Sequence, residues 1–283
     1  MLRTATSLRT LERDDRDAVL ALCAQDPVAN VTVAERVEQV GTEPVRLGGE
    51  IWGLFEQGRL VSACWAGANL IPVEVRDEAA MDAFASRARR SGGVYSSLFG
   101  EASAVLGLWQ RLSSMGWRAR EVRECQPLFT LAGPPAVEPD PGVHRATADD
   151  LLTVLPASVA MFTEEVGYSP VSTDGGLAYR RRVAELLRQG RTFVRRGPGG
   201  EIQFKADLGC VSSAVAQVHG VWVDPRWRGQ GISAPAMAAV VVAALRDDAP
   251  TVSLYVNDYN HRALAAYRRV GFTQCGTFAT VLF

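Results

Sequence analysis

The sequence contains a single lysine, Lys205, and all its other strongly basic side chains are arginines. Lysine and arginine together number 30 against 31 acidic residues, so the formal net charge is −1 at pH 7. Non-specific binding to nucleic acid requires a broad surplus of positive charge. The charge balance therefore argues against a nucleic-acid partner, and the preference for arginine is typical of a GC-rich genome rather than of a function.

Long apolar runs are also missing. The longest uncharged apolar run, residues 234–245, has twelve residues, whereas a membrane-spanning helix needs roughly 18. The first residues, MLRTATSLRTLERDD, lack the apolar core of a signal peptide. We therefore expect a cytoplasmic protein with no membrane partner.

Cysteine is sparse and scattered. The five cysteines form no C-x-x-C pair and have no histidine close by in the sequence: Cys23, Cys64, Cys125, Cys210 and Cys275. This spacing argues against both a zinc site and a disulfide framework. We expect no metal, and thiols that are buried or chemically idle.

The chain of 283 residues exceeds the usual size of one domain. The clearest break in composition is GPPAVEPDPG at 133–142, whose four prolines cannot continue a helix or a central strand. We therefore predict a first domain at 1–132, a linker at 133–142 and a second domain at 143–283.

The two halves of the sequence have the same order of predicted elements. LRTLERDDRDAVL near the start resembles VHRATADDLLTVL after the linker, and hairpin patterns follow at 51–66 and 192–208. Residues 94–117 and 252–272 then share a strand, loop, helix and Gly-aromatic ending. Each half reads as strand, helices, hairpin, strand, helix, strand, helix, strand. This order predicts an α/β fold, with a central mixed sheet flanked by helices, and suggests an internal duplication.

The stretch RWRGQGIS at 226–233 lies between a predicted strand at 214–223 and a predicted helix at 233–246. A helix start presents unpaired amides and a partial positive charge, which suit an anion that the chain can approach closely. Glycine at 229 and 231 would permit that approach. The alternatives are a plain turn or one of three phosphate-bearing ligands.

Two of these ligands fit poorly. A P-loop needs Gly-Lys followed by Ser or Thr, and the only lysine is at 205. A Rossmann loop matches Gly229, Gly231 and Ala234, and Asp258 would imitate its ribose-binding acid. However, five residues separate the strand from Gly229, and too little chain follows to complete a doubly wound sheet. Coenzyme A pyrophosphate remains.

VWVDPRWRGQGIS resembles the acyl-CoA-binding motif of the GNAT acetyltransferase superfamily, Arg/Gln-x-x-Gly-x-Gly/Ala after a strand. Arg226, Gly229 and Gly231 fill its defined positions. The second family segment follows, with a strand at 252–256, Asn257, Asn260 and a helix containing AAYRRVGF. The whole chain resembles double-domain bacterial members whose first GNAT-like half is degenerate.

This resemblance implies acetyl-CoA as co-substrate and direct attack by an amine in a ternary complex, without a metal. Main-chain groups of 221–223 would pair with the pantetheine arm, with an N–H at the oxyanion, and the amides of 228–233 would hold the pyrophosphate. The implied coenzyme-binding residues are Val221, Trp222, Val223, Arg226, Arg228, Gly229, Gln230, Gly231, Ile232, Ser233, Asn257 and Asn260.

Acyl transfer to an amine also needs an acid for the departing thiolate and a base for the amine. Tyr267 matches the family's general-acid tyrosine, although it also continues an apolar helix stripe. The family's glutamate before the loop is replaced by Gln217, so we consider His219, or a carboxylate of the pair Glu164 and Glu165, of which we favour Glu165, as the base. The structural alternatives are a core histidine and two solvated glutamates.

The first half lacks these parts. Aligning 115–117 with 270–272 places Ala102, Val105 and Leu112 where the second half has Asn257, Asn260 and Tyr267. We expect the second half to be an N-acyltransferase for acetyl or short acyl groups, with a small-molecule or amino-acid-like amine as acceptor rather than a protein. The alternative is a sensor that binds acyl-CoA without turnover. The sequence does not specify the oligomeric state.

Overall fold

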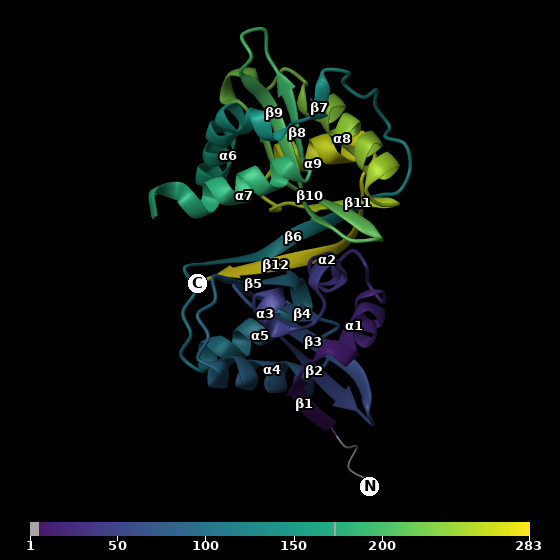
Figure 1. Ribbon diagram of the computed structural model, residues 1–283, viewed down its shortest axis with the longest axis vertical. Coiled ribbons are helices and arrows are strands. Elements are labelled where there is room, and N and C mark those ends of the chain that lie inside the picture. The colour runs from purple at the N-terminus through teal and green to yellow at the C-terminus, as the bar shows by residue number, and fades with distance from the viewer. Residues whose placement is uncertain (1–5, 173) are drawn as a thin grey trace. The chain divides into compact units, whose positions relative to one another are not determined.

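The computed structural model describes residues 6–172 and 174–283 (Figure 1). The described chain forms two compact units. Unit 1 combines the residues up to Leu128 with Tyr255–Tyr259 and Gln274–Phe283, and unit 2 combines Phe129–Leu254 with Asn260–Thr273.

Unit 1 begins with strand β1 and a set of short helices and then builds most of a sheet. Its elements are β1 (Thr6–Thr10), the 3-10 helix η1 (Arg13–Asp15), α1 (Arg16–Cys23), α2 (Val31–Val40), α3 (Pro44–Leu47), β2 (Glu50–Glu56), β3 (Arg59–Ala66), β4 (Asn69–Val73), α4 (Glu78–Ser91), β5 (Ser97–Glu101), α5 (Ala102–Ser114), most of β6 (Glu121–Leu131) and most of β12 (Thr273–Leu282). The strand order is β1-β2-β3-β4-β5-β12-β6.

The second half of the chain repeats this series, although most of its last strand, β12, belongs to unit 1. The elements of unit 2 are β7 (Val143–Arg145), η2 (Ala148–Asp150), α6 (Leu151–Val166), η3 (Asp174–Gly176), α7 (Leu177–Arg188), β8 (Thr192–Arg196), β9 (Ile202–Val211), β10 (Val215–Val223), η4 (Pro225–Trp227), α8 (Ser233–Asp247), β11 (Thr251–Tyr255) and α9 (His261–Val270). The strand order is β11-β10-β9-β8-β7, and β10 runs parallel to β11. The predicted order of elements and the α/β fold class with a mixed sheet are confirmed.

The repeat extends to local chemistry at the first helix of each unit. Glu12 and Asp15 form a reciprocal capping box at η1, and Thr147 and Asp150 form the same box at η2. Each box satisfies amide groups that a helix start leaves without a partner. Asp15 and Asp150 therefore cap helices at corresponding places in the two halves.

The compact units differ from the predicted domain boundaries at the end of the chain. The boundary 143–283 assigns the last strand to the second half, but β12 pairs with β5 of unit 1, from Phe278↔Glu101 to Leu282↔Ser97. Ala279 and Val281 of β12 are fully buried in the core of unit 1. Strand pairing at long range, which no local pattern reports, makes β12 part of unit 1.

Each unit has helices on both faces of its strands. In unit 1, Ile51 of β2 packs in the core under α1 and α2, whereas the next residue, Trp52, packs under α4 and α5. This alternation follows from the two-residue period of a strand. In unit 2, α6 and α7 lie on one face of β8–β10 and α8 and α9 on the other (Figure 1). In the described part of the chain, every helix is too short or too polar to cross a bilayer.

Candidate active site

The site is built where two parallel strands of unit 2 separate. β10 pairs with β11 from Val215↔Thr251 to Val218↔Leu254. Beyond Val218, β10 continues to pair with β9 on its other side, through Trp222↔Lys205 and Val223↔Phe204. The edge of β10 that faces β11 therefore has no strand partner at 221–223 among the described residues.

A bulge accompanies this separation. Three residue steps of β10, from His219 to Trp222, lie opposite two steps of β9, from Asp207 to Lys205. Gly220 at the bulge has φ +55°, a left-handed conformation that glycine adopts without a steric penalty. Bulges of this kind redirect a strand and are common beside active sites.

The turn after β10 is held by its own side chains. Asp224 caps η4 by accepting the N–H of Arg226 at 2.9 Å, and Pro225 occupies the first helical position, which it favours. The Arg226 guanidinium also donates to Asp224 Oδ2 at 2.7 Å. This pairing holds the pKa of the Asp224 carboxyl below its usual range. Arg226 therefore braces the turn.

The loop that follows presents amide groups without internal partners. Helix α8 starts at Ser233, and its N-cap, Ile232, supplies no side-chain cap. Within the described residues, the amides of 229–233 donate no backbone hydrogen bond. Gly229 and Gly231 have φ values of +78° and +77°, and a β-carbon on either would meet no atom within 4 Å. Open amides at a helix start suit an anion such as a phosphate.

Glu164, near the end of α6, links this loop to β10. It accepts hydrogen bonds from Trp222 Nε1 at 3.1 Å and from Arg228 Nη2 at 2.7 Å. Arg228 Nε also donates to the carbonyl oxygen of Val223 at 2.9 Å. The side chain of Gln230 also bonds to the main chain of this turn, because its Nε2 donates to the Arg226 carbonyl oxygen at 3.2 Å. Of this acidic pair the sequence analysis favours Glu165 as the catalytic residue, and Glu164 is the one that contacts Trp222 and Arg228.

Tyr267 and Glu165 interact electrostatically. Tyr267 lies on α9 and is 6% exposed. Its ring packs edge-on against Phe272, with 6.1 Å between the ring centroids. Burial raises the pKa of the Tyr267 phenol, and the negative charge of Glu165 raises it further. The phenol is therefore protonated at neutral pH and can donate a proton or hydrogen bond. Leu264 and Val270 are buried on the same helix, so Tyr267 also belongs to the predicted apolar stripe.

His219 lies on β10 against Gly209 of β9. Its Nε2 is 2.8 Å from Gln217 Oε1, a contact that requires the proton on Nε2 because the amide oxygen only accepts. Burial lowers the pKa of His219 to about 4, and the positive charge of Arg182 contributes to this lowering. The imidazole is therefore neutral at pH 7 but weakly basic, and this geometry favours the core-histidine interpretation.

The two asparagines have different surroundings. Asn260 caps α9 by accepting the N–H of Ala263 at 3.2 Å. Asn257 belongs to unit 1 and is buried, with its Oδ1 accepting from Gln126 Nε2 at 2.9 Å. The other predicted site residues all belong to unit 2.

The sequence analysis did not predict a buried ion pair, with a threonine bound to it, beneath the β10 bulge. Lys205 and Asp207 form an ion pair on β9, and Thr192 Oγ1 on β8 donates to Asp207 Oδ1 at 2.8 Å. The available signal was that position 205 holds the only lysine of the chain. Within the residues that the structure describes, no three His, Cys, Asp or Glu side chains gather in a way that could hold a metal ion.

In unit 1, the helices that correspond to α8 and α9 of unit 2 are capped at their N-termini by carboxylate side chains. Helix α4 occupies the place in the element order that α8 has in unit 2, and Asp77 caps it by accepting the N–H of Ala80. Helix α5 is capped by Glu101, which accepts the N–H groups of Ser103 and Ala104. A carboxylate on these amides excludes a phosphate from them. This capping favours the prediction that the first half lacks a coenzyme site.

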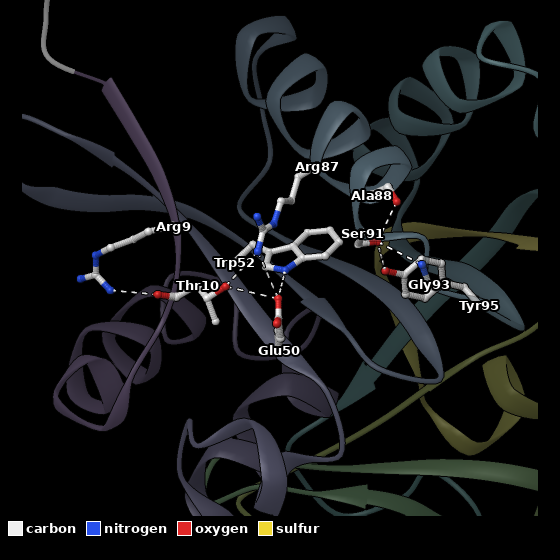
Figure 2. Close-up of polar contacts among 9 residues, drawn as sticks. All are labelled: Arg9, Thr10, Glu50, Trp52, Arg87, Ala88, Ser91, Gly93 and Tyr95. Carbon is white, nitrogen blue, oxygen red and sulfur yellow. Dashed lines mark hydrogen bonds and ion pairs between the residues drawn. The ribbon is translucent and has the colours of Figure 1, made fainter.

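A different polar network stabilises unit 1. Glu50 of β2 accepts hydrogen bonds from Trp52 Nε1 at 2.7 Å and from Thr10 Oγ1 of β1 at 3.2 Å. Its carboxylate also pairs with the Arg87 guanidinium of α4, at 3.3 Å. Figure 2 draws these contacts as dashed lines. Hydrogen bonding by Trp52, Thr10 and Arg87 lowers the pKa of the Glu50 carboxyl. The network ties α4 to the first two strands.

Comparisons with known proteins agree with this architecture. The acetyltransferase (GNAT) family matches residues 193–272, and a domain of unknown function (DUF4081) matches residues 49–154. The mycothiol acetyltransferase of Acidimicrobium ferrooxidans is 38% identical over 61 residues, which are 22% of this chain and 20% of that protein. The matched segment thus spans a fifth of that relative's length.

Two solved structures resemble nearly the whole chain. A GNAT-family acetyltransferase from Colwellia psychrerythraea has a TM-score of 0.57 at 13% identity, over 98% of this chain and 99% of that one. A tandem GNAT protein from the clavulanic acid biosynthesis pathway has a TM-score of 0.53 at 16% identity, over 98% of both chains. The chain therefore has the fold of the GNAT acetyltransferases along nearly its whole length, and its residues 193–272 match the GNAT family.

Proposed function

We propose that unit 2 transfers an acetyl or other short acyl group from its coenzyme A thioester to an amine. The observation that carries this proposal is the combination of a separated β10 edge with unpartnered amides at 229–233. The first provides main-chain groups for an extended pantetheine arm, and the second provides an anion site for the pyrophosphate. Both lie within the segment that matches the GNAT family.

The residues present fit the coenzyme on two grounds. The amides of 229–233 donate no backbone hydrogen bond among residues 6–172 and 174–283, and a β-carbon on Gly229 or Gly231 would meet no described atom within 4 Å. The main chain of Val221–Val223 would hold the pantetheine and place an N–H at the acyl oxygen. Arg228, now paired with Glu164, lies at the same loop. Asn260 uses its oxygen as a cap, so a coenzyme contact would use its amide nitrogen.

Tyr267 is the proposed acid for the departing thiolate. Its hydroxyl stays protonated because burial and Glu165 both raise its pKa, and a neutral phenol donates a hydrogen bond to a developing negative charge. Proton donation of this kind contributes about 10²–10⁴ in rate. Substituting Tyr267→Phe removes only the hydroxyl and leaves the ring in its apolar stripe.

Glu165 is the proposed base, acting through a water molecule. Its negative charge contributes to the raised pKa of the Tyr267 phenol, which is the observation that links this carboxylate to the proposed acid. His219 is the weaker candidate because its pKa is lowered to about 4 and its Nε2 contacts Gln217. Glu164 is occupied by Trp222 and Arg228. A carboxylate at the end of α6 would also attract a cationic amine.

The proposed acceptor is a small-molecule amine, an amino-acid-like one included. A relative named as a mycothiol acetyltransferase supports acetyl transfer as the reaction class. Since that match spans a fifth of the relative, its acceptor is not transferred to this chain. Acceptor identity is the part of the function that an amine panel must supply.

The proposed function is tested by measuring ligand binding and acyl-transfer turnover on the same protein. Thermal unfolding is followed with acetyl-CoA, coenzyme A or NAD, and thiol release is then measured across a panel of primary amines. We expect stabilisation by acetyl-CoA and coenzyme A but not by NAD, and thiol release with at least one amine. Tyr267→Phe should keep the stabilisation and lose about 10²–10⁴ in rate. Stabilisation by NAD alone would contradict the coenzyme A assignment.

One observation favours a second candidate, a sensor that binds acyl-CoA without turnover. Gln217 replaces the family's glutamate, and it engages His219 rather than providing a base. The protonated Tyr267 argues against this candidate because a sensor needs no acid. Stabilisation by acetyl-CoA without thiol release for any amine, in both the native protein and Tyr267→Phe, would support the sensor.

A further inference from the structure

The only lysine of the chain is buried beneath the β10 bulge. The Lys205 side chain is 1% exposed, and its Nζ contacts Asp207 Oδ2, whose side chain is 10% exposed. Thr192 Oγ1 donates to the second oxygen of Asp207 at 2.8 Å. Both charges therefore have their closest partners within the unit, on β8 and β9.

The strand register places this pair under the bulge itself. Asp207 lies opposite His219, and Lys205 lies opposite Trp222, so the pair spans the interval in which β10 carries its extra residue. A β-carbon on Gly220 would be 3.2 Å from Asp207 Oδ2 and 3.6 Å from Lys205 Nζ. Met161 of α6 would be 3.0 Å away. These three side chains form the floor on which the bulge rests.

Stability does not explain why the pair is charged. Removing two charges from water costs free energy, and replacing a buried ion pair by apolar residues of similar volume is often neutral or stabilising. The choice of lysine is also specific, because every other residue of this charge type is arginine. A lysine ends in a compact ammonium, whereas the planar guanidinium of arginine is larger. The confined floor beneath Gly220 suits the smaller group.

We propose that the Lys205–Asp207 ion pair is a positioning element of the acyl site, which holds the Gly220–Val221 bulge so that main-chain N–H groups of β10 face the acyl oxygen. This inference rests on the proposed acyl transfer. The physical basis is the two-residue period of a strand. If the bulge were lost and β10 paired regularly with β9, the residues after Gly220 would shift register and point to the opposite face of the sheet. The N–H groups at 221–223 would then lose their direction.

The position of the pair predicts which step it affects. The amides that would hold the pyrophosphate lie at 229–233, beyond the turn that Asp224 and Arg226 brace. The bulge instead lies at the reacting end of β10. Loss of the pair should therefore reduce the polarisation of the bound acyl carbonyl much more than the affinity for coenzyme A, because the amides at 229–233 would still hold the pyrophosphate.

The experiment uses acetyl-CoA labelled with ¹³C at its carbonyl carbon and the double variant Lys205→Met/Asp207→Leu, which removes both charges and keeps most of the volume. Difference infrared spectroscopy measures the carbonyl stretch of the bound label, and calorimetry measures the Kd for coenzyme A. We expect a lowered stretching frequency in the native protein and its return toward the free value in the variant. We expect the Kd to change less than about threefold and kcat, where an amine turns over, to fall about 10- to 100-fold.

Two further variants make the result specific. Arg145→Met/Asp248→Leu removes another ion pair of unit 2, between β7 and the end of α8, and should leave the carbonyl frequency native. Gly220→Ala inserts a β-carbon into the ionic floor and should reproduce the loss of the frequency shift while coenzyme A still binds. This variant tests the same contact if the double variant does not fold.

The outcomes separate the two proposals. If the Lys205→Met/Asp207→Leu and Gly220→Ala variants polarise the carbonyl as the native protein does, the positioning role is wrong and acyl transfer stands. If Asp207→Asn alone abolishes turnover with native polarisation, Asp207 acts as a proton acceptor and the positioning role is again wrong. If the native protein does not bind acetyl-CoA, both proposals are overturned.

Discussion

Two glycines, at 229 and 231, carry most of the coenzyme assignment at the scale of single residues. Both have left-handed backbones and open space where a side chain would start, so a substitution there acts on ligand approach more than on packing. Neighbouring Arg226 and Arg228 instead contact Asp224 and Glu164 within the protein. Ligand binding should therefore depend more on the glycines than on the arginines.

Gly231→Glu should abolish stabilisation by acetyl-CoA, because it places a carboxylate beside the amides that would hold the pyrophosphate. The matched control is Gly200→Glu, in the turn before β9, where φ is +82° and a β-carbon would also meet nothing within 4 Å. Both variants strain the backbone similarly, and only the first should lose the ligand-dependent rise in melting temperature. At a concentration 100 times the Kd that rise corresponds to about 2.7 kcal/mol. Equal loss in both variants would contradict the assignment.

His219 should make the protein less stable in mild acid. Its pKa is lowered to about 4 in the fold from 6.5, so between these values the unfolded chain binds a proton that the folded chain does not. The free energy of unfolding therefore falls as pH drops from about 6.5 to about 4, by roughly 1–3 kcal/mol. Urea unfolding of native protein and His219→Gln across this range measures the difference. His144→Gln, at an exposed position on β7, should keep the native pH dependence.

At the scale of elements, the two units differ most at corresponding helix starts. Asp77 closes the start of α4, whereas α8 begins without a side-chain cap. The linkers before these helices also differ, since only the second contains the Arg-x-x-Gly-x-Gly pattern. A few residues at one strand-to-helix junction thus separate the uncapped start of α8, the proposed phosphate site, from the capped start of α4.

Strand β12 should stabilise unit 1 although it comes from the end of the chain. Phe278 is 2% exposed and pairs with Glu101 of β5. The centroid of its ring lies 5.1 Å from that of the Tyr255 ring. Phe278→Ala should lower the free energy of unfolding of unit 1 by about 3–5 kcal/mol. Urea unfolding followed by tryptophan fluorescence measures it, since four of the six tryptophans belong to unit 1: Trp52, Trp65, Trp109 and Trp117. Gln274→Ala, at an exposed position of β12, should change stability little, and an equal loss there would contradict this role.

At the scale of the whole molecule, the cysteines fall into two classes. Cys23, Cys64 and Cys210 are buried, and Cys125 and Cys275 are exposed. Burial raises the pKa of Cys23 and of Cys64 to about 12, which suppresses their reactive thiolate forms. A thiol reagent should therefore label two cysteines in the folded protein and five in denaturant. Rapid labelling of Cys23 or Cys64 without denaturant would show that unit 1 opens readily.

Much of the architecture follows from local patterns. The capping boxes, the hairpins and the strand, loop and helix around RWRGQGIS each depend on residues close in the sequence, so periodicity and turn chemistry predict them. Asn260 as a helix cap belongs to the same class. The cytoplasmic location remains a prediction from composition.

Tertiary structure decided the remaining features because they depend on contacts between distant residues. The pairing of β12 with β5, the different surroundings of Glu164 and Glu165, and the weak basicity of His219 all follow from long-range packing. The lone lysine was visible in the sequence, but only the register of β8, β9 and β10 shows that it lies beneath a bulge beside Asp207. The sequence alone thus determined the elements and the RWRGQGIS motif between β10 and α8, and the fold determined which charges meet, because register and burial arise only when the strands pair.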